Sequence, residues 1–289
     1  MSPLVSLLLP TRGRPVLATR FLKSVADTTS HPDKVEIIIY VDDDDAESHD
    51  IDYPGLKIKR IIGSRKTMGE YNSECFEASK GDIIVLVNDD MIIKTQGWDE
   101  RLRELDNSIK DKVYLAYGND LFKKGNLCTF PILSRKTCEI LQKPYHPAYR
   151  GAFIDYHLMD IFKRLEHAGY SRIFYLKDVV FEHLHYRTGK AEFDETYKAR
   201  GRFDDDMLFI GLADVRKASL PLLLAEIEGK KDGGGEVLPD FIEQDPPTNI
   251  FKAALTFSDI FLGDKSLPFK WRFFMWWWFL ARYIAHKLD

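Results

Sequence analysis

Residues 67–90 read TMGEYNSECFEASKGDIIVLVNDD, and this stretch decides the predicted fold. Thr67 and Glu70 have the Ser/Thr-x-x-Glu spacing of a capping box, in which two side chains satisfy backbone N–H groups of a first helical turn. A helix is therefore expected from Thr67 to Gly81, where the glycine ends it. Ile83–Val87 follows as a wholly apolar run, typical of a buried strand, and ends at an Asn-Asp-Asp triplet.

The segments before this stretch have the same alternating pattern. Val5–Leu9 and Val35–Val41 are short apolar runs, Lys57–Ile62 is a third predicted strand, and apolar side chains recur at helical spacing after Pro10. Strands that alternate with helices form a mostly parallel sheet, so the sequence predicts a doubly wound α/β domain. Beyond residue 90 the pattern predicts three helices and three strands, at Trp98–Leu105, Arg135–Leu141, Tyr156–His167, Val113–Tyr117, Arg172–Leu176 and Val179–Phe181.

Polar residues follow three of the predicted strands. Thr11–Arg14 follows the first, Asp42–Asp45 the second, and Asn88–Asp90 the fourth. Ligands of open α/β sheets bind beyond the carboxyl ends of the strands. Carboxylates at that edge suit a hard divalent cation, Mg²⁺ or Mn²⁺, which neutralises the charge of a leaving diphosphate. A solvated acidic turn is the alternative interpretation of an isolated Asn-Asp-Asp triplet.

The order of these motifs resembles that of the family 2-type glycosyltransferases, which have the GT-A fold. In that family a Gly-x-x-x-Asn helix start, a helix end at Gly-Asp, an apolar strand and an Asp-x-Asp motif occur in the order found from Gly69 to Asp90. Leu9–Arg14 is similar to the family's first strand and Pro-Thr-x-x-Arg loop, and Tyr40–Asp43 to its nucleoside-binding strand end. The resemblance covers about two thirds of the chain.

The resemblance implies a set of donor-binding residues at the strand ends and at the start of the central helix. The implied donor is a nucleotide-sugar, with UDP as the expected nucleotide, and Asp90 is the implied metal ligand. The donor-binding residues are Pro10, Thr11, Arg14, Asp42, Asp43, Arg65, Met68, Gly69, Asn72, Asn88 and Asp89. Asn88 stands where the family's first Asp usually lies, which removes one charge and leaves Asp89 as a substitute.

The catalytic base has two candidates. The segment Asp155–Tyr170 is similar to the family's acidic motif, helix and Ala-Gly-Tyr turn, but it lacks the usual Glu-Asp pair. A base must lie within hydrogen-bond reach of the attacking acceptor hydroxyl. Counting back from Ala168 favours Asp160, whereas the loop-to-helix position favours Asp155. We give the count slightly more weight, so Asp160 is the first candidate and Asp155 the second.

A second metal ligand is expected at the end of a later strand. Val179–His185 is similar to the family's last core strand, which often ends in a histidine of the metal shell. A neutral imidazole is a suitable ligand beside carboxylate and phosphate oxygens. His183 is the first candidate and His185 the second, with a structural role as the alternative for each. The cations of the segment from Arg187 to Tyr197 are suited to contact the donor diphosphate.

The C-terminal segment poses a separate question. Phe273–Ala281 is apolar on every helical face, and Lys265–Leu288 contains no acidic residue. Nine residues are too few for a hydrocarbon core that needs about 20, but an aromatic and basic helix suits the headgroup region. The sequence leaves open whether residues 269–288 contact a membrane, the catalytic domain or a second subunit. A membrane contact would fit a lipid-linked acceptor.

Composition limits the alternatives. The net charge is −4 and no Lys/Arg-rich run is present, so nucleic acid is not an expected partner. The three cysteines are odd in number and lack metal-ligand or disulfide spacing, which indicates a reducing compartment. Val5–Pro10 is too short for a signal peptide. We therefore expect a cytoplasmic protein, with peripheral contact to the cytoplasmic membrane as an open alternative.

The sequence thus predicts a GT-A-like catalytic domain over residues 1–205 and a helical extension over residues 206–289. The expected reaction is a metal-dependent, inverting sugar transfer to a glycan or lipid-linked acceptor, in surface glycan assembly. A sugar-phosphate nucleotidyltransferase is disfavoured, because Thr11–Pro15 has a single glycine and cannot form a Gly-rich triphosphate loop. A catalytically inactive binding module is the non-enzymatic alternative, kept open by Asn88 and the missing Glu-Asp pair.

Overall fold

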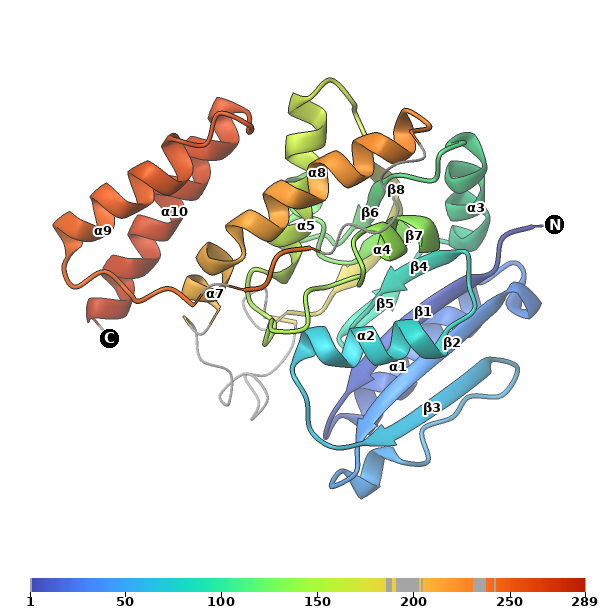
Figure 1. Ribbon diagram of the computed structural model, residues 1–289. Helices are drawn as coiled ribbons and strands as arrows, with labels where there is room; N and C mark the ends of the chain where they lie inside the picture. Colours follow the sequence, from blue (N-terminus) through green and yellow to red (C-terminus); the bar gives the residue numbers. More distant parts are fainter. Residues whose placement is uncertain are drawn as a thin grey trace.

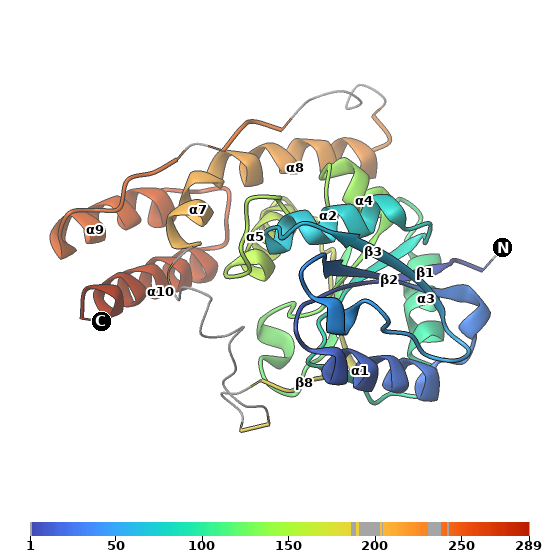
Figure 2. The same ribbon diagram turned by 90° about the horizontal axis from the view of Figure 1, so that it is seen from below.

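The computed structural model describes residues 2–185, 189–190, 203, 205–230, 238–241 and 243–288. In this part of the chain one mixed sheet lies between two layers of helices (Figure 1, Figure 2). Its strands are β1 Val5–Thr11, β2 Val35–Asp42, β3 Lys57–Gly63, β4 Ile83–Leu86, β5 Met91–Ile93, β6 Leu115–Asn119, β7 Pro131–Ser134 and β8 Ile173–His183. Their order across the sheet is β3-β2-β1-β4-β7-β6-β8-β5.

The first four strands of this order are parallel neighbours, as the sequence predicts. Leu8 of β1 lies beside Ile38 of β2 and Leu86 of β4 in the register of the sheet. The carboxyl ends of β2, β1 and β4 therefore lie at one edge, which carries Asp42, Thr11 and the residues after β4. The strands β7 and β5 are antiparallel to their neighbours β4, β6 and β8. The predicted mostly parallel α/β fold is thus confirmed.

The helices cover both faces of the sheet because alternate strand residues point to opposite cores. Leu7 and Leu9 of β1 share one core with Phe21 of α1, and Leu8 shares the other with Phe76 of α2. The helices are α1 Pro15–Thr28, α2 Met68–Ala78, α3 Trp98–Ser108, α4 Arg135–Ile140, α5 Ile154–His167, α7 Asp206–Gly211, α8 Ala213–Ile227, α9 Ile250–Phe257 and α10 Phe269–Leu288, with short 3₁₀ or π turns at Pro32–Lys34, Ala46–Ser48, Lys124–Asn126 and Ser258–Leu262.

Two predicted strands are one strand in the structure. The segments expected at Arg172–Leu176 and Val179–Phe181 form the continuous β8. The register against β6 shifts between Gly118 and Asn119, so the polar and exposed residues between the two apolar segments are accommodated as an irregularity of one strand. The capping box at Thr67 is confirmed, because its hydroxyl accepts the Glu70 N–H and the Glu70 carboxylate accepts the Thr67 N–H.

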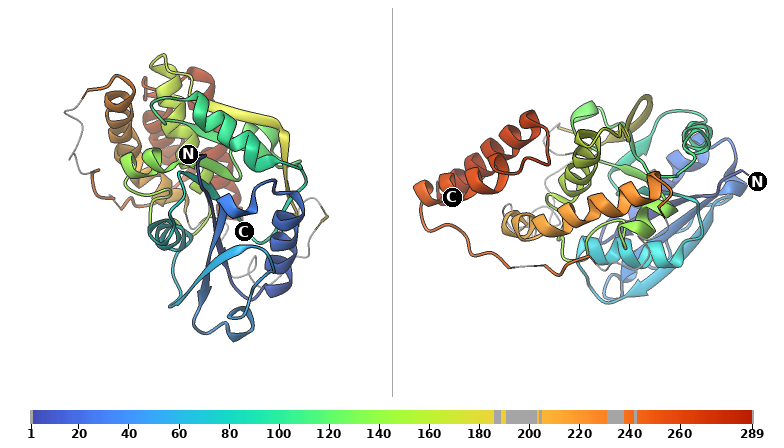
Figure 3. Two further views of the ribbon diagram at one scale, coloured as in Figure 1. Left: turned by 90° about the vertical axis from the view of Figure 1, so that its right-hand side faces the viewer. Right: turned by 45° about the horizontal axis from the view of Figure 1, so that its top comes forward.

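The C-terminal helices are attached to the main core. Leu223 of α8 and Phe279 of α10 belong to the same apolar cluster as Phe162 of α5. This core therefore runs across the predicted boundary near residue 205. The helices α9 and α10 lie side by side, on the side of the molecule away from β1 to β3 (Figure 1, Figure 3). Within the described residues no helix is long and apolar enough to cross a membrane.

Candidate active site

Asp90 and His183 meet at the end of β8, where Met91 at the start of β5 pairs with His183. The Asp90 carboxylate oxygen Oδ2 lies 3.3 Å from His183 Nε2, and both side chains are buried. The backbone fixes this pairing, since the Leu184 N–H donates to the Asp90 carbonyl and the His183 N–H donates to the Asp120 carbonyl. The Phe130 ring packs edge-on against the imidazole, with centroids 5.2 Å apart. The two predicted metal ligands are thus brought together from positions 93 residues apart.

The chemistry and spacing of this pair fit a divalent cation. Two ligands at right angles around an octahedral ion, each about 2.1 Å from it, lie about 3 Å apart. This value is close to the 3.3 Å between Asp90 Oδ2 and His183 Nε2. Among the described residues no group of three or more His, Cys, Asp or Glu side chains is arranged to hold a metal. A bound ion would therefore need further oxygens from a donor diphosphate and water, as substrate-bridged Mg²⁺ sites do.

Asp89 points to the neighbouring strand end instead. Its Oδ2 accepts a 2.8 Å hydrogen bond from the Thr11 hydroxyl, and its Oδ1 lies 3.2 Å from the Arg14 guanidinium. Burial raises the pKa of Asp89 to about 6, against the opposing effect of Arg14, and the neighbouring Asp90 carboxylate adds to the rise. Asp89 thus ties the end of β1 to the end of β4, and three of the predicted donor-binding residues lie in direct contact.

The end of β2 carries a second polar cluster, centred on Asp42. Its carboxylate accepts hydrogen bonds of 2.5 Å from both the Tyr71 hydroxyl and the Arg12 guanidinium. The Tyr71 ring also packs on Tyr40, with ring centroids 4.8 Å apart. Neither Arg12 nor Tyr71 was predicted as a site residue from the sequence. Tyr71, near the start of α2, could have been noticed in the sequence, because a tyrosine beside a ligand site offers both a ring for stacking and a hydroxyl for hydrogen bonds.

The start of α2 is held against a loop from the second half of the chain. A Cβ at Gly69 would lie 2.1 Å from the His146 carbonyl oxygen, so only glycine allows this approach. The Gly69 N–H donates to the Tyr149 carbonyl at 2.9 Å. The Asn72 side chain is buried and donates to the Met68 carbonyl, while its Oδ1 has no hydrogen-bond partner in the described structure. An acceptor in this state is suited to receive a hydrogen bond from a ligand.

The remaining predicted donor-binding residues lie around these clusters. Pro10 is buried in β1, and Asn88, directly after β4, is half-buried. Asp43 and Arg65 are exposed, in the loops after β2 and β3. The segment between Arg187 and Tyr197 lies outside the described residues, apart from two positions. One of them, Lys190, forms an ion pair with Glu182.

Asp155 lies in the first turn of α5. The Tyr145 hydroxyl donates to its carboxylate at 2.9 Å, and the Cys128 thiol donates to its backbone carbonyl at 3.3 Å. Cys128 is two residues from Phe130, whose ring contacts His183. The start of α5 is thus connected through one short segment to the pair Asp90–His183.

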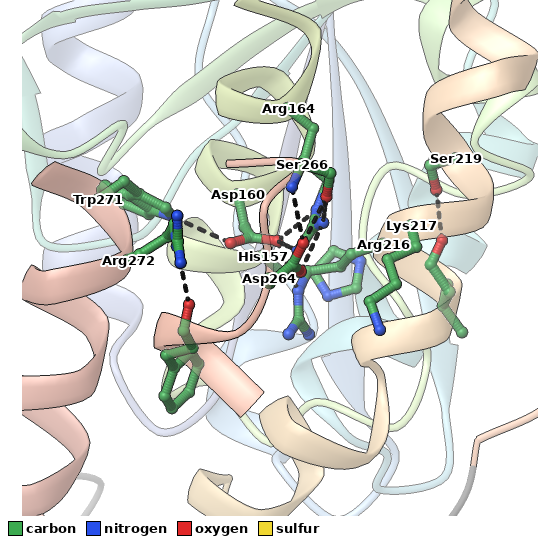
Figure 4. A network of polar contacts seen from close by, with 12 residues as sticks. His157, Asp160, Arg164, Arg216, Lys217, Ser219, Asp264, Ser266, Trp271 and Arg272 are labelled. Carbon is green, nitrogen blue, oxygen red and sulfur yellow. Dashed lines mark hydrogen bonds and ion pairs between the residues drawn. The ribbon is translucent and has the colours of Figure 1, made fainter. Parts of the chain in front are cut away.

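Asp160 occupies a different environment, about 7.5 Å further along the helix axis. Its Oδ2 accepts hydrogen bonds from Arg164 and Arg216, and its Oδ1 accepts one of 2.9 Å from the Trp271 indole N–H (Figure 4). Asp264 pairs with the same Arg164 at 2.8 Å. Both carboxylate oxygens of Asp160 accept hydrogen bonds within the protein, from two buried guanidinium groups and from the indole of α10. We therefore do not retain Asp160 as the base, and Asp155 takes its place as the candidate.

His157 of α5 and Tyr149, in the loop before this helix, form a buried pair. His157 Nδ1 lies 3.0 Å from the Tyr149 hydroxyl, and both side chains are buried. Burial lowers the pKa of His157 well below its usual range, and the nearby Arg216 guanidinium adds to the decrease. The neutral imidazole is therefore part of the folded state, and no role of His157 was predicted from the sequence.

This pair predicts a pH dependence of stability. Below the usual histidine pKa of about 6.5 the unfolded chain binds a proton at His157 and the folded chain does not. The free energy of unfolding therefore decreases as the pH is lowered. The expected contribution is up to about 1.4 kcal/mol per pH unit below pH 6.5. Urea unfolding at pH 7 and pH 5 should show a larger loss for the wild type than for His157→Gln. Equal losses in the two proteins would contradict this assignment.

The fold is similar to that of solved glycosyltransferases. The mannosyltransferase PcManGT from Pyrobaculum calidifontis, in complex with GDP-Man and Mn²⁺, has a TM-score of 0.52 and 15% identity, with 100% of this chain and 88% of that chain covered. TarS from S. aureus, in complex with UDP-GlcNAc, has a TM-score of 0.52 and 12% identity, with 92% and 82% covered. No family model matches the chain. No curated protein matches it in sequence either. The chain thus has the α/β fold of these enzymes, and the predicted GT-A-like fold is confirmed.

Proposed function

We propose that this protein is a nucleotide-sugar-dependent glycosyltransferase of the family 2 type. The observation that carries the proposal is the contact between Asp90 Oδ2 and His183 Nε2 at the carboxyl edge of the sheet. Next to Asp90, Asp89 accepts a hydrogen bond from the Thr11 hydroxyl. Thr11 lies beside Val41 of β2, and Asp42 follows Val41 at the end of that strand. Ligands of open α/β sheets bind at this edge. The donors bound by the two solved neighbours, GDP-Man and UDP-GlcNAc, support the same donor class for this chain.

The donor nucleotide is assigned to the edge formed by β2, β1 and the start of α2. The base would lie beside the half-buried Tyr71, whose ring packs on the buried Tyr40, and the ribose hydroxyls would lie near Asp42. Asn72 and Asn88 are further candidates for these contacts. A nucleotide that enters this region competes with Arg12 for Asp42, because the guanidinium now pairs with that carboxylate. Arg12 then becomes a cation for the donor's diphosphate. We retain UDP as the expected nucleotide.

Asp90 and His183 would hold Mn²⁺ or Mg²⁺. When bound there, the cation would neutralise charge on the leaving diphosphate. The Mn²⁺ in the complex of PcManGT supports a divalent metal in this chain. His183 has its backbone and ring position fixed by Asp120 and Phe130, so the imidazole needs little rearrangement.

Asp155 is assigned as the general base. Its carboxylate accepts the proton of the acceptor hydroxyl as the oxygen attacks the anomeric carbon and the bond from that carbon to the diphosphate oxygen breaks. A single displacement of this kind inverts the anomeric centre. Tyr145 orients the carboxylate through the 2.9 Å hydrogen bond to Oδ1. The acceptor is expected to be a hydroxyl of a growing surface glycan or of a lipid-linked sugar.

The experiment that tests this function is a donor-turnover assay. The purified protein is incubated with Mn²⁺ and with UDP-, GDP- and dTDP-sugars in turn, and free nucleoside diphosphate is measured. We expect release from one nucleotide class at a rate above the protein-free blank, because many such sites also transfer sugar slowly to water. Addition of EDTA should abolish the release. If no donor gives nucleotide above the blank, with or without sugar acceptors, the inactive binding module becomes the better account.

A further inference from the structure

The outer face of α10 is apolar where a surface helix is normally polar. Phe269, Phe273 and Trp277 are 68%, 50% and 58% exposed. The three side chains are four residues apart, so they form one stripe along the helix, here called the aromatic stripe. The adjacent α9 exposes Phe251 and Leu255 at the same spacing. Exposed apolar side chains in a row of this kind indicate an interaction site.

The aromatic stripe points away from the protein core. The buried side chains of α10 are Met275, Phe279 and Tyr283, again at a spacing of four. Trp277 is two residues from Met275, and two residues correspond to about 200° around a helix. The buried and exposed stripes therefore lie on opposite sides of α10. Phe279 packs on Phe153 and Phe257, so this helix is fixed to the core by one face and presents the other outward.

The charges from Lys265 to the end of α10 are basic, whereas Asp259 and Asp264 precede this segment and Asp264 is paired with Arg164. Lys265 and Lys270 are exposed next to the aromatic stripe, and Lys287 is exposed at the end of the helix. No Asp or Glu occurs between Lys265 and Leu288. Exposed aromatic rings with flanking lysines are typical of helices that lie in the interface of an anionic bilayer. Each lysine near such a surface contributes about 1 kcal/mol of attraction.

A second copy of the chain is a poorer match for this surface. In a two-fold symmetric dimer the same patch faces itself. Such an interface would contain the lysines of both copies, and no acidic residue between Lys265 and Leu288 would offset them. Insertion across a bilayer is also not supported, since no described helix is long and apolar enough. An anionic lipid surface satisfies both the apolar side chains and the cations.

We propose that α10 docks the protein on an anionic membrane surface, with the aromatic stripe in the headgroup region and the flanking lysines at the lipid phosphates. This proposal does not depend on the sugar-transfer activity. It assigns to the C-terminal helices a binding role at a membrane, where a glycosyl acceptor carried by a lipid would be accessible to the catalytic domain.

Vesicle flotation tests this proposal directly. The full-length protein is mixed with vesicles of phosphatidylcholine alone, or of an equimolar mixture with phosphatidylglycerol. We expect it to float with the anionic vesicles and much less with the neutral ones. The triple variant Phe269→Ser, Phe273→Ser, Trp277→Ser should bind at least about tenfold more weakly, because three large apolar side chains are lost from the interface. Lys265→Glu with Lys270→Glu should reduce binding to anionic vesicles alone.

The matched control is Val16→Ser, which removes another exposed apolar side chain, 77% exposed on α1. It should float like the wild type. Melting curves of all variants establish that they fold, and the lysine variants keep the test valid if the triple variant does not. Equal binding by the wild type and the lysine variants, or no flotation, would overturn the proposal. So would a wild-type dimer in light scattering that the triple variant converts to a monomer, since the stripe would then be an interface between copies.

Discussion

Replacement of Asp155 by Asn is expected to lower kcat for sugar transfer by about 100- to 10,000-fold, the usual contribution of a general base. The amide cannot accept the proton of the acceptor hydroxyl, but it can still accept the hydrogen bond from Tyr145. Donor binding and the melting temperature should therefore change little. Steady-state rates at saturating donor and acceptor, together with a melting curve, provide the measurement.

Glu166→Gln is the matched control for this substitution. Glu166 lies on the same helix and pairs with Lys163 away from the start of α5. Its neutralisation should leave kcat unchanged. A wild-type rate in Asp155→Asn would exclude Asp155 as the base, and an equal loss of rate in both variants would indicate a general effect of charge on α5.

Replacement of Asp160 by Ala is expected to destabilise the protein by about 3–5 kcal/mol, because it leaves buried charges without their partner. The carboxylate is the shared acceptor for Arg164, Arg216 and Trp271. For a chain of this size such a loss lowers the melting temperature by about 5–10 °C. Thermal and urea unfolding measure the change.

Two further substitutions serve as comparisons for Asp160→Ala. Asp160→Asn keeps the acceptor that Trp271 uses and should fall between the wild type and Asp160→Ala. Asp214→Asn removes an exposed carboxylate of α8 that pairs only across one helical turn with Lys217, and it should change the stability by less than about 0.5 kcal/mol. A fully stable Asp160→Ala protein that has lost its turnover would restore Asp160 as the base and contradict the network interpretation.

The fold was predictable where local pattern and tertiary structure agree. The strands from β1 to β4 are apolar runs, and the capping box at Thr67 is a local device, so both follow from short segments of sequence. The strands β5 and β7 were not predicted. Each has only three or four residues and pairs with a strand far away in the chain, β5 with β8 and β7 with β4, although β7 also pairs with the nearer β6. A strand this short has too few residues to show the alternation of apolar and polar side chains by which strands are recognised in a sequence.

The choice between Asp155 and Asp160 shows what sequence cannot supply. Both are acidic residues on one predicted helix, and only their partners distinguish them. The two groups that fix Asp160, Arg216 and Trp271, lie 56 and 111 residues further along the chain. The Tyr145 contact that orients Asp155 comes from a loop. The contact between Asp90 and His183, in contrast, was anticipated because the resemblance to family 2-type glycosyltransferases implied both residues as metal ligands.

The central claim is that Asp90 and His183 hold a divalent cation on a nucleoside diphosphate. The most direct measurement is a thermal-shift panel of UDP, GDP, dTDP and CMP and their sugars, with and without Mn²⁺, on the wild type and on Asp90→Ala. A ligand that binds only the folded state increases the free energy of unfolding, by about 2.7 kcal/mol at a concentration of 100 times its Kd, and so raises the melting temperature. We predict a shift with one nucleoside diphosphate that requires Mn²⁺ and disappears in Asp90→Ala. No shift with any nucleotide, or a shift that needs neither Mn²⁺ nor Asp90, would contradict the claim.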